Sequence, residues 1–234
     1  ALTGFDFAAL PELVEPTSRL GSVTPQAAAD TGIPAGTPVI CGTSDSAVED
    51  YGAGAVEPGD CIVKLATAGN VNVMTASACP YPSTLTYGHV IPGMWYTVSA
   101  TNAAALCQRW FRDLFGDAEK AEAGACAGRV FDLMDRRAAA SPAGANGVMF
   151  HPYLQGERSP YWDAELRGSF TGLSIASTRG DFIRALLEGV AFSLLDCYGL
   201  IEEMGLPVKR IFLIGGGARS ALWSGIVCDV FNLP

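Results

Sequence analysis

An aspartate at the junction of a short strand and a helix is the first residue of this chain that could do chemistry. Residues 38–41 form an apolar run, which is typical of a buried strand, and Gly42 ends the run. Residues 47–51 continue with helical character, so Asp45 lies where ligands bind in α/β sheets. A carboxylate in that place can accept the proton of a substrate hydroxyl. Asp45 could instead simply cap the helix, because Asp is a favoured N-cap residue.

The residues just after Asp45 bear on this alternative. Ser46 and Glu49 have the spacing of a capping box, in which the two side chains bond to each other's backbone N–H groups. We therefore expect Ser46 to cap the helix and to leave the Asp45 carboxylate available to a substrate.

A glycine-rich turn between a second strand and a second helix is the next candidate site. Residues 210–214 read as a strand, Gly215, Gly216 and Gly217 follow, and residues 222–231 read as a helix. Glycines let a ligand approach the backbone closely, and a helix start offers N–H groups to a phosphate. The spacing fits neither a P-loop nor a dinucleotide-binding fingerprint. A tight turn without a ligand is the alternative.

A third turn joins two expected strands at residues 61–67 and 71–74, which read as a tight β-hairpin. The Thr67 hydroxyl in this turn could touch a terminal phosphate, although most such turns only reverse the chain. We further expect a short helix capped by Thr24, a strand at 94–98, helices at 103–115, 118–139 and 181–204, and a short buried strand at 147–150. Residues 79–93 and 154–180 read as loops, and Glu157, Arg158 and Asp163 as surface ion pairs.

The composition excludes several classes of protein. The chain has 234 residues, of which 49% are hydrophobic and 17% charged, so it can build a sizeable core. Its net charge of −9, with scattered Lys and Arg, argues against nucleic-acid binding. Seven Cys without a Cys-x-x-Cys pair indicate reduced thiols and a cytoplasmic location. Two His exclude a His-rich metal site, and neither a membrane span nor a signal peptide is recognisable. A nucleophile elbow and protein-kinase signatures are absent as well.

Four stretches of the chain together resemble the FGGY family of carbohydrate kinases. They are residues 38–45 with 52–56, residues 65–69, residues 153–163 with 167–173 and 181–192, and residues 211–234. They follow one another in the family's order and cover nearly all of the chain from residue 20 onward. These motifs are most similar to those of family members that act on pentuloses such as xylulose.

The resemblance implies an α/β fold of the actin-like ATPase type, also called ribonuclease-H-like, with a mixed sheet flanked by helices. It implies that residues 1–37 connect from a preceding kinase domain. Residues 38–234 would then form the C-terminal domain, cut short at its end. Because half of the family's cleft belongs to the preceding domain, we expect the isolated chain to lack kinase activity.

The resemblance also implies roles for individual residues in phosphoryl transfer from ATP, with Mg²⁺, to a sugar hydroxyl. Asp45 would be the general base and would bind the sugar together with Ser46. The implied nucleotide-binding residues are Thr67, Gly69, Gly216, Gly217 and Ala218, and no metal ligand is implied in this chain. Relatives commonly show a Gly-Gly pair where this chain has Asn102-Ala103-Ala104, so we do not rely on a nucleotide contact there.

Sugar and ATP are therefore the expected partners, without nucleic acid or membrane, and the family is compatible with a homodimer. A kinase for another polyol or sugar acid, such as glycerol or gluconate, is an alternative. A sugar or nucleotide sensor of the same fold without enzymatic activity is another, which the acidic residue at position 45 disfavours. A hydrolase or dehydrogenase is disfavoured by the absent motifs.

Overall fold

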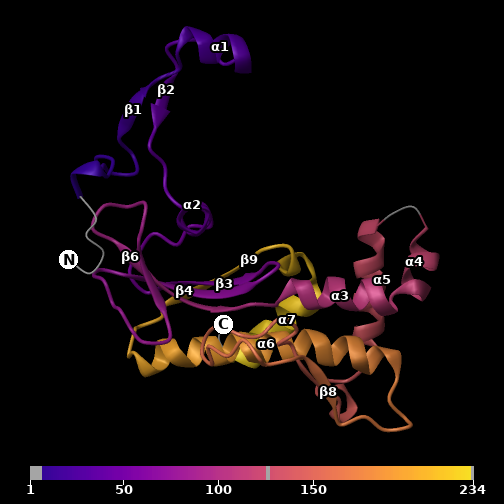
Figure 1. Ribbon diagram of the computed structural model, residues 1–234. Coiled ribbons are helices and arrows are strands. Elements are labelled where there is room, and N and C mark those ends of the chain that lie inside the picture. The colour runs from indigo at the N-terminus through magenta and orange to yellow at the C-terminus, as the bar shows by residue number, and fades with distance from the viewer. Residues whose placement is uncertain (1–6, 125–126, 233–234) are drawn as a thin grey trace.

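The structure is a computed structural model that describes residues 7–124 and 127–232. An α/β body carries a separate arm near the N-terminal end (Figure 1). The strands are β1 (Arg19–Ser22), β2 (Pro38–Ile40), β3 (Asp60–Leu65), β4 (Gly69–Thr75), β5 (Leu85–Gly88), β6 (Trp95–Thr101), β7 (Met149–His151), β8 (Ser169–Thr171) and β9 (Arg210–Ile214). The α-helices are α1 (Pro25–Thr31), α2 (Asp45–Gly52), α3 (Ala105–Phe115), α4 (Asp117–Ala123), α5 (Ala127–Ala139), α6 (Arg179–Glu203) and α7 (Ala221–Phe231). Short 3₁₀ turns are η1 (Phe7–Ala9), η2 (Ala145–Gly147) and η3 (Gly217–Arg219).

The body is built on a five-stranded mixed sheet in the order β5-β6-β4-β3-β9. Neighbouring strands are antiparallel except for β3 and β9, which run parallel. The tight hairpin expected around Thr67 is confirmed, since Leu65 of β3 pairs with Gly69 of β4. Because β3 and β9 run the same way, the turns that follow them leave the sheet at the same edge.

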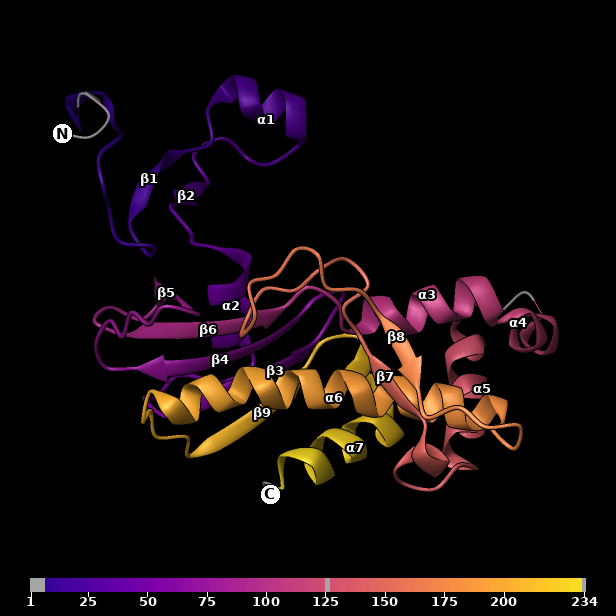
Figure 2. The same ribbon diagram turned by 60° about the horizontal axis from the view of Figure 1, so that its bottom comes forward.

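Alternating side chains give the sheet two apolar faces of different size. Cys61, Val63 and Leu65 belong to the larger core, which helix α6 covers along its length (Figures 1 and 2). Ile62 and Met74 point to the other face, where α2 lies above the strands (Figure 1). This face has a smaller core, to which α2 contributes Ala47.

Helix α6 is the main support of the larger face. Thr178 and Asp181 form a capping box at its start: the Asp181 N–H lies 3.3 Å from Thr178 Oγ1, and the Thr178 N–H lies 2.7 Å from Asp181 Oδ2. Helix α7 docks on α6 through Trp223, whose Nε1–H donates to the Leu187 carbonyl at 3.0 Å. The helices expected at 181–204 and 222–231 are therefore confirmed to within two residues at each end. Among the described helices none has both the length and the apolar character that crossing a membrane requires.

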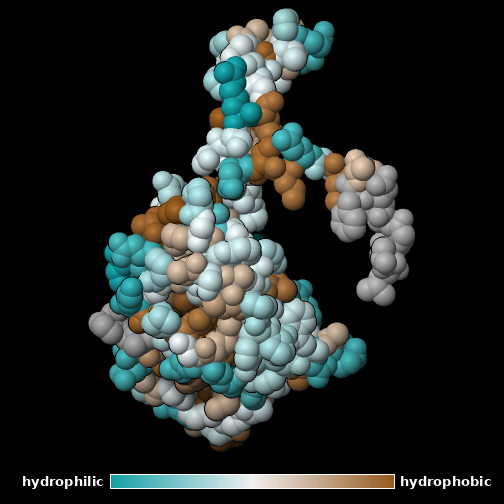
Figure 3. All heavy atoms as spheres, turned by 90° about the vertical axis from the view of Figure 1, so that its left-hand side faces the viewer, coloured by the Kyte–Doolittle hydropathy of each residue, from teal (hydrophilic) through white to brown (hydrophobic). Residues whose placement is uncertain are grey.

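The arm corrects one expectation. Residues 38–40 do form a strand, β2, but it pairs with β1 in a small antiparallel hairpin and not with the central sheet. Val39 and Ile40 are 41% and 51% exposed, so the expectation of a buried strand is wrong. Apolar surface gathers on this arm, which stands away from the body (Figure 3). Among the described strands, β2 pairs with β1 alone, so it lies outside the central sheet and its core.

Other expected elements are present with changed bounds. The strand at 94–98 extends to Thr101 as β6, and the helix at 103–115 begins at Ala105 as α3. Residues 79–93 and 154–180 are not wholly loop, because they contain the short strands β5 and β8. The single helix expected at 118–139 is instead α4 and α5, with residues 125–126 outside the described part.

Candidate functional site

Two turns meet at the edge of the sheet where the parallel strands β3 and β9 end. The register pairs Lys64 with Ile214, so residues 66–68 and 215–217 leave the sheet beside each other. A Cβ built on Gly215 would lie 2.5 Å from the Leu65 carbonyl oxygen. The two turns therefore approach each other too closely for a side chain at position 215. Ligands in α/β proteins bind at such an edge, outside the carboxyl ends of the strands.

The turn around Thr67 is held by the start of helix α3. The N–H groups of Ala104 and Leu106 donate to the Thr67 carbonyl at 3.0 and 3.2 Å, and that of Ala105 donates to the Ala66 carbonyl at 2.7 Å. These amides would be unpaired at a free helix start. Here they stabilise the turn, so the Ala104 amide is already bonded and is not available to a nucleotide.

Arg109 approaches the same turn one helical turn further along α3. Its Nη2–H donates to the Thr67 hydroxyl oxygen at 2.8 Å, and the side chain is exposed. A guanidinium beside a hydroxyl is a suitable environment for an anionic phosphate. Arg109 could not be identified from the sequence, because nothing in the local pattern of α3 shows that this residue faces Thr67.

A cleft of about 820 Å³ opens between these turns and helices α3 and α5. Its volume lies within the range of about 300–1,000 Å³ that is usual for small-molecule sites. The residues that line it are Ala66, Thr67, Ala105, Gln108, Arg109, Phe131, Asp132, Asp135, Gly216, Gly217, Arg219, Ser220, Ala221 and Leu222. The structure thus brings Thr67 together with Gly216 and Gly217, which lie far from it in the sequence. Gly69 and Ala218 are not among the lining residues.

The glycines around the cleft serve different purposes. A Cβ on Gly216 would meet no protein atom within 4 Å, and its φ of −64° suits any residue. A Cβ on Gly217 would lie 2.9 Å from Leu65 Cβ, and one on Gly69 would lie 2.8 Å from a Leu194 methyl carbon. Packing therefore explains Gly69 and Gly217, whereas nothing in the protein itself requires glycine at 216. The absent side chain leaves that wall of the cleft open.

Two carboxylates from helix α5, Asp132 and Asp135, line the same cleft. Burial raises the pKa of Asp135; a hydrogen bond with Ser220 opposes this, and the neighbouring Asp132 charge adds to it. Gln108 Nε2–H donates to Asp135 Oδ1 at 3.4 Å. Neither carboxylate could be identified from the sequence, since α5 lies far along the chain from either turn.

These carboxylates do not by themselves form a metal site. Within the described ranges no three His, Cys, Asp or Glu residues are grouped so as to hold a metal, and Asp135 already bonds Gln108 and Ser220. Proteins usually bind Mg²⁺ through one or two carboxylates, with water and phosphate oxygens as the remaining ligands. Asp132 and Asp135 could therefore contact a magnesium ion only together with a bound nucleotide, and no metal ligand is assigned to the cleft.

Asp45 and Ser46 lie apart from the cleft, at the start of helix α2. The expected capping box is wrong: the N-cap is Ser44, whose Oγ accepts the Ala47 N–H at 3.3 Å. Asp45 follows as an exposed residue whose Oδ1 accepts the Ser46 N–H at 2.8 Å, and Ser46 is half-buried. The Asp45 carboxylate is therefore neither buried nor used as the cap, so its second oxygen can meet a ligand.

The charged loop at 157–163 does not consist of surface ion pairs. Glu157 is 4% exposed, and its Oε1 accepts the N–H groups of Asn102 and Arg158, each at 2.7 Å. The Arg158 guanidinium donates instead to the Thr101 carbonyl at 3.1 Å. These bonds attach the loop to the end of β6. Backbone N–H groups, and not basic side chains, provide the hydrogen bonds that the buried Glu157 carboxylate needs.

Comparison with known proteins gives a consistent result. The model of the "FGGY family of carbohydrate kinases, C-terminal domain" matches residues 64–234. The chain is 36% identical to a xylulose kinase of Staphylococcus epidermidis over 225 residues, which are 95% of this chain and 43% of that protein. It is 32% identical to a gluconokinase of Bacillus subtilis over 229 residues, 95% of this chain and 44% of the relative.

A solved structure agrees with these relatives. The crystal structure of a xylulose kinase from Rhodospirillum rubrum superposes with a TM-score of 0.81 at 34% identity, covering 98% of this chain and 45% of that one. The chain thus spans less than half the length of the proteins that it matches. The likeness confirms the expected α/β fold of the actin-like kinase type. Since the family match extends over most of its length, the chain belongs to the FGGY family of carbohydrate kinases and contains that family's C-terminal domain.

Proposed function

We propose that this chain is the C-terminal part of a kinase that transfers the γ-phosphoryl group of ATP to a hydroxyl of a pentulose, D-xylulose or a close relative. The observation that carries the proposal is the cleft at the ends of β3 and β9, where an open glycine wall at Gly216 faces the Thr67 turn and Arg109. Such a cleft suits a nucleotide, whose phosphates need close backbone approach and positive charge.

In this proposal the nucleotide lies along the cleft. Thr67, with Gly69 supporting the turn, and Arg109 face the phosphates. Gly216 and Gly217 line the proposed adenosine side, where Gly216 leaves room for the ligand, and Ala218 follows them in the turn without lining the cleft. Phosphoryl transfer depends mainly on holding the reactants in line and on stabilising their charge. The role of this cleft is therefore to hold ATP, and no step is assigned to a metal.

Asp45 is the proposed general base. Its carboxylate is exposed, and only Oδ1 is engaged, by the Ser46 N–H. The second carboxylate oxygen can take the proton of the sugar hydroxyl while the hydroxyl oxygen attacks the γ-phosphorus. Ser46 lies beside Asp45 and would bind the sugar. Residues 38–234 would form the C-terminal domain, with residues 1–37 as the connector from a preceding domain in the cytoplasmic enzyme.

The base assignment is tested by Asp45→Asn in the complete protein, which includes the N-terminal part that the relatives have. We expect kcat to fall by about 10²–10⁴-fold, the usual worth of general-base catalysis. The ATP dissociation constant and the thermal midpoint should stay unchanged, because Asp45 neither caps α2 nor lines the cleft. Asp117→Asn is the control, since Asp117 also lies in the first turn of a helix and is 90% exposed. Near-normal kcat in Asp45→Asn would remove Asp45 from the mechanism.

The sugar is tested separately. Relatives named xylulose kinase and gluconokinase match at 36% and 32% identity, so gluconate is the second candidate. The complete protein is assayed with ATP, Mg²⁺ and a panel of D-xylulose, other pentuloses, gluconate and glycerol. We expect the highest kcat/KM with a pentulose. A preference for gluconate would overturn the substrate, and sugar binding without phosphorylation of any member would indicate a sensor.

A further inference from the structure

Helix α2, which carries the proposed base, is fastened to the sheet mainly by polar side chains. Only Ala47 and Asp50 of this helix are buried, and only Ala47 belongs to the apolar core beneath it. Asn72 Nδ2–H donates to both Asp50 carboxylate oxygens at 3.0 and 3.2 Å, and Lys64 pairs with Glu49. These two contacts hold the middle of the helix. A third contact is needed to fix its start, where Asp45 lies.

Tyr96 makes that third contact. Its hydroxyl lies 3.3 Å from the Ser44 hydroxyl, and Ser44 is the N-cap that accepts the Ala47 N–H. The Ser44 oxygen can accept from the amide while its own hydrogen bond joins it to Tyr96. The cap of α2 is thus connected to strand β6 by one hydroxyl–hydroxyl bond.

Tyr96 is a rigid anchor for this bond. It is 1% exposed and lies in the interior of the sheet, opposite Met74 of β4 and Tyr87 of β5. The Tyr87 ring packs against it with centroids 5.5 Å apart, and the His89 ring meets it at 6.4 Å, nearly edge-on. Burial is also the main cause of the raised pKa of Tyr96, so its hydroxyl stays protonated at neutral pH and remains a hydrogen-bond partner.

We propose that Tyr96 is a positioning residue for the Asp45 carboxylate, acting through the Ser44 cap. The inference rests on the proposed role of Asp45 as the base. Asp45 is the first residue after the cap, and its own Oδ1 bonds the next backbone N–H, so its carboxylate follows any rotation of the helix start. A small misplacement of a reacting group is enough to lower the rate strongly. Tyr96 is 1% exposed, so it would act through Ser44 and not on the substrate directly.

The test uses Tyr96→Phe, which removes only the hydroxyl, and Tyr87→Phe as the matched control. Tyr87 lies next to Tyr96 and is 44% exposed, and the hydrogen bond to the Ser44 hydroxyl comes from Tyr96. In this chain we expect the Ala47 amide to exchange with solvent about fivefold faster in Tyr96→Phe, as the loss of one neutral hydrogen bond predicts. The amides of β3 and β4 should exchange as before, and Tyr87→Phe should leave Ala47 unchanged.

In the complete protein, Tyr96→Phe should lower kcat about five- to tenfold while the ATP KM stays within about twofold. The same substitution in an Asp45→Asn background should have no further effect on kcat, because the residue that it positions is then already inactive. An equal decrease in both backgrounds would overturn the positioning role, and so would a Tyr96→Phe enzyme that behaves like Tyr87→Phe. If Asp45→Asn alone leaves kcat unchanged, the proposed function fails first and this inference falls with it.

Discussion

Gly216 and Gly217 are adjacent in the sequence but meet opposite constraints in space. The space that a Gly216 side chain would fill is empty, whereas the space beside Gly217 holds Leu65 and the Trp223 ring, 2.9 and 3.0 Å away. Folding therefore requires only one of these two glycines. For the other, Gly216, we propose that the nucleotide approaches the backbone closely.

This difference gives a prediction for Gly216→Ala and Gly216→Val. Both should fold normally, and the alanine variant should gain slightly in stability, by at most about 1 kcal/mol, because the unfolded chain loses freedom. Both should weaken ATP binding to this chain, Val more than Ala, by about tenfold or more for Val, which corresponds to roughly 1.4 kcal/mol. Binding is measured by calorimetric titration, and stability by thermal unfolding.

Gly217→Ala is the matched comparison. Its methyl group would overlap packed atoms, so we expect a loss of stability of about 1–3 kcal/mol. A Gly216 variant that loses stability as Gly217→Ala does, or that binds ATP as tightly as the unchanged chain, would mean that the turn is only structural.

At the scale of elements, the attachment of α2 to the sheet includes a carboxylate that is unfavourable when charged. Asp50 is 1% exposed, and its burial raises its pKa from 3.8 to about 6, with the Asn72 hydrogen bond and the Lys64 charge opposing this. Between these two pH values the folded protein holds this proton more tightly than the unfolded chain does. The contribution of Asp50 to the free energy of unfolding is therefore fully present below about pH 4 and decreases as the pH rises to about 6.

Asp50→Asn should remove this pH dependence. We expect the variant to be more stable than the unchanged chain at pH 7, by about 1–3 kcal/mol, and similar to it near pH 4. Urea unfolding at a series of pH values measures the difference. Asp30→Asn on the exposed helix α1 is the control and should follow the unchanged chain throughout. A variant that is less stable than the unchanged chain at pH 7 would show that the charged form of Asp50 holds α2 in place.

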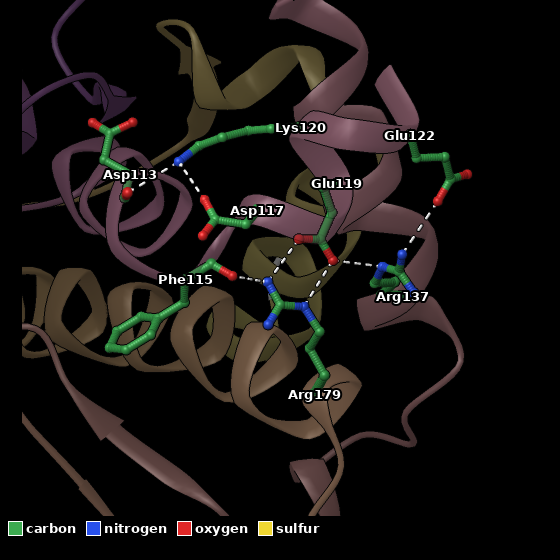
Figure 4. A network of polar contacts seen from close by, with 8 residues as sticks. All are labelled: Asp113, Phe115, Asp117, Glu119, Lys120, Glu122, Arg137 and Arg179. Carbon is green, nitrogen blue, oxygen red and sulfur yellow. Dashed lines mark hydrogen bonds and ion pairs between the residues drawn. The ribbon is translucent and has the colours of Figure 1, made fainter. Parts of the chain in front are cut away.

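A second buried carboxylate, Glu119 of α4, has the opposite character. Its side chain is 0% exposed and lies between two arginines (Figure 4). Arg179 of α6 donates from Nε at 2.8 Å and from Nη2 at 2.6 Å, and Arg137 of α5 pairs with the same carboxylate at 2.5 Å. The Arg179 hydrogen bonds lower the pKa of Glu119 despite its burial. One side chain thus joins three helices, so this network supports the wall of the cleft that α5 provides.

Glu119→Gln should therefore lower stability by about 1–3 kcal/mol, since a buried acceptor is lost while both arginines keep partial access to water. The loss should be largest above about pH 4.5 and smaller in acid, where Glu119 itself becomes protonated. Glu122→Gln is the control: Glu122 pairs with Arg137 at 3.2 Å but is 50% exposed, so it should cost well under about 1 kcal/mol. Equal effects of the two substitutions would show that the buried position of Glu119 has no special importance. Both are measured by chemical unfolding of this chain.

The elements that sequence patterns predicted best are those whose own residues determine them. Strand β9 has the predicted bounds, since an apolar run ends at a glycine turn with φ of +96°. Strand β5 was missed because its four residues lie between turns and are largely exposed. The cap of α2 was misplaced because Ser44 and Ser46 look alike locally. The Tyr96 hydroxyl lies within hydrogen-bond distance of Ser44, and Glu49 pairs with Lys64 and not with Ser46.

At the scale of the whole molecule, the candidate site could be predicted only where the chain itself turns. The Thr67 and Gly216 turns were predicted from their own residues and from the family resemblance. Arg109, Asp132 and Asp135 enter the cleft from helices α3 and α5, and no local pattern shows which face of those helices points inward. The parallel pairing of β3 with β9 brings together residues about 150 positions apart, which only the assembled sheet reveals.

The same architecture predicts how the isolated chain should behave. The cleft of this chain already combines the Thr67 turn, Arg109 and the open wall at Gly216, so we expect it to bind ATP on its own. Asp45 lies on α2, outside the cleft, and the chain spans 43–45% of the length of the kinases that it matches. A sugar held between Asp45 and the phosphates then needs contacts from the rest of such a kinase. In a calorimetric titration we expect the isolated chain to bind ATP, and Gly216→Val to weaken this binding. In a coupled assay we expect no sugar-dependent release of ADP from the isolated chain. Adding the complete protein to the same assay should restore turnover with the pentulose panel. Sugar-dependent turnover by the isolated chain would mean that its own residues form the whole sugar site, and a chain that binds no ATP would mean that the cleft is not the nucleotide site.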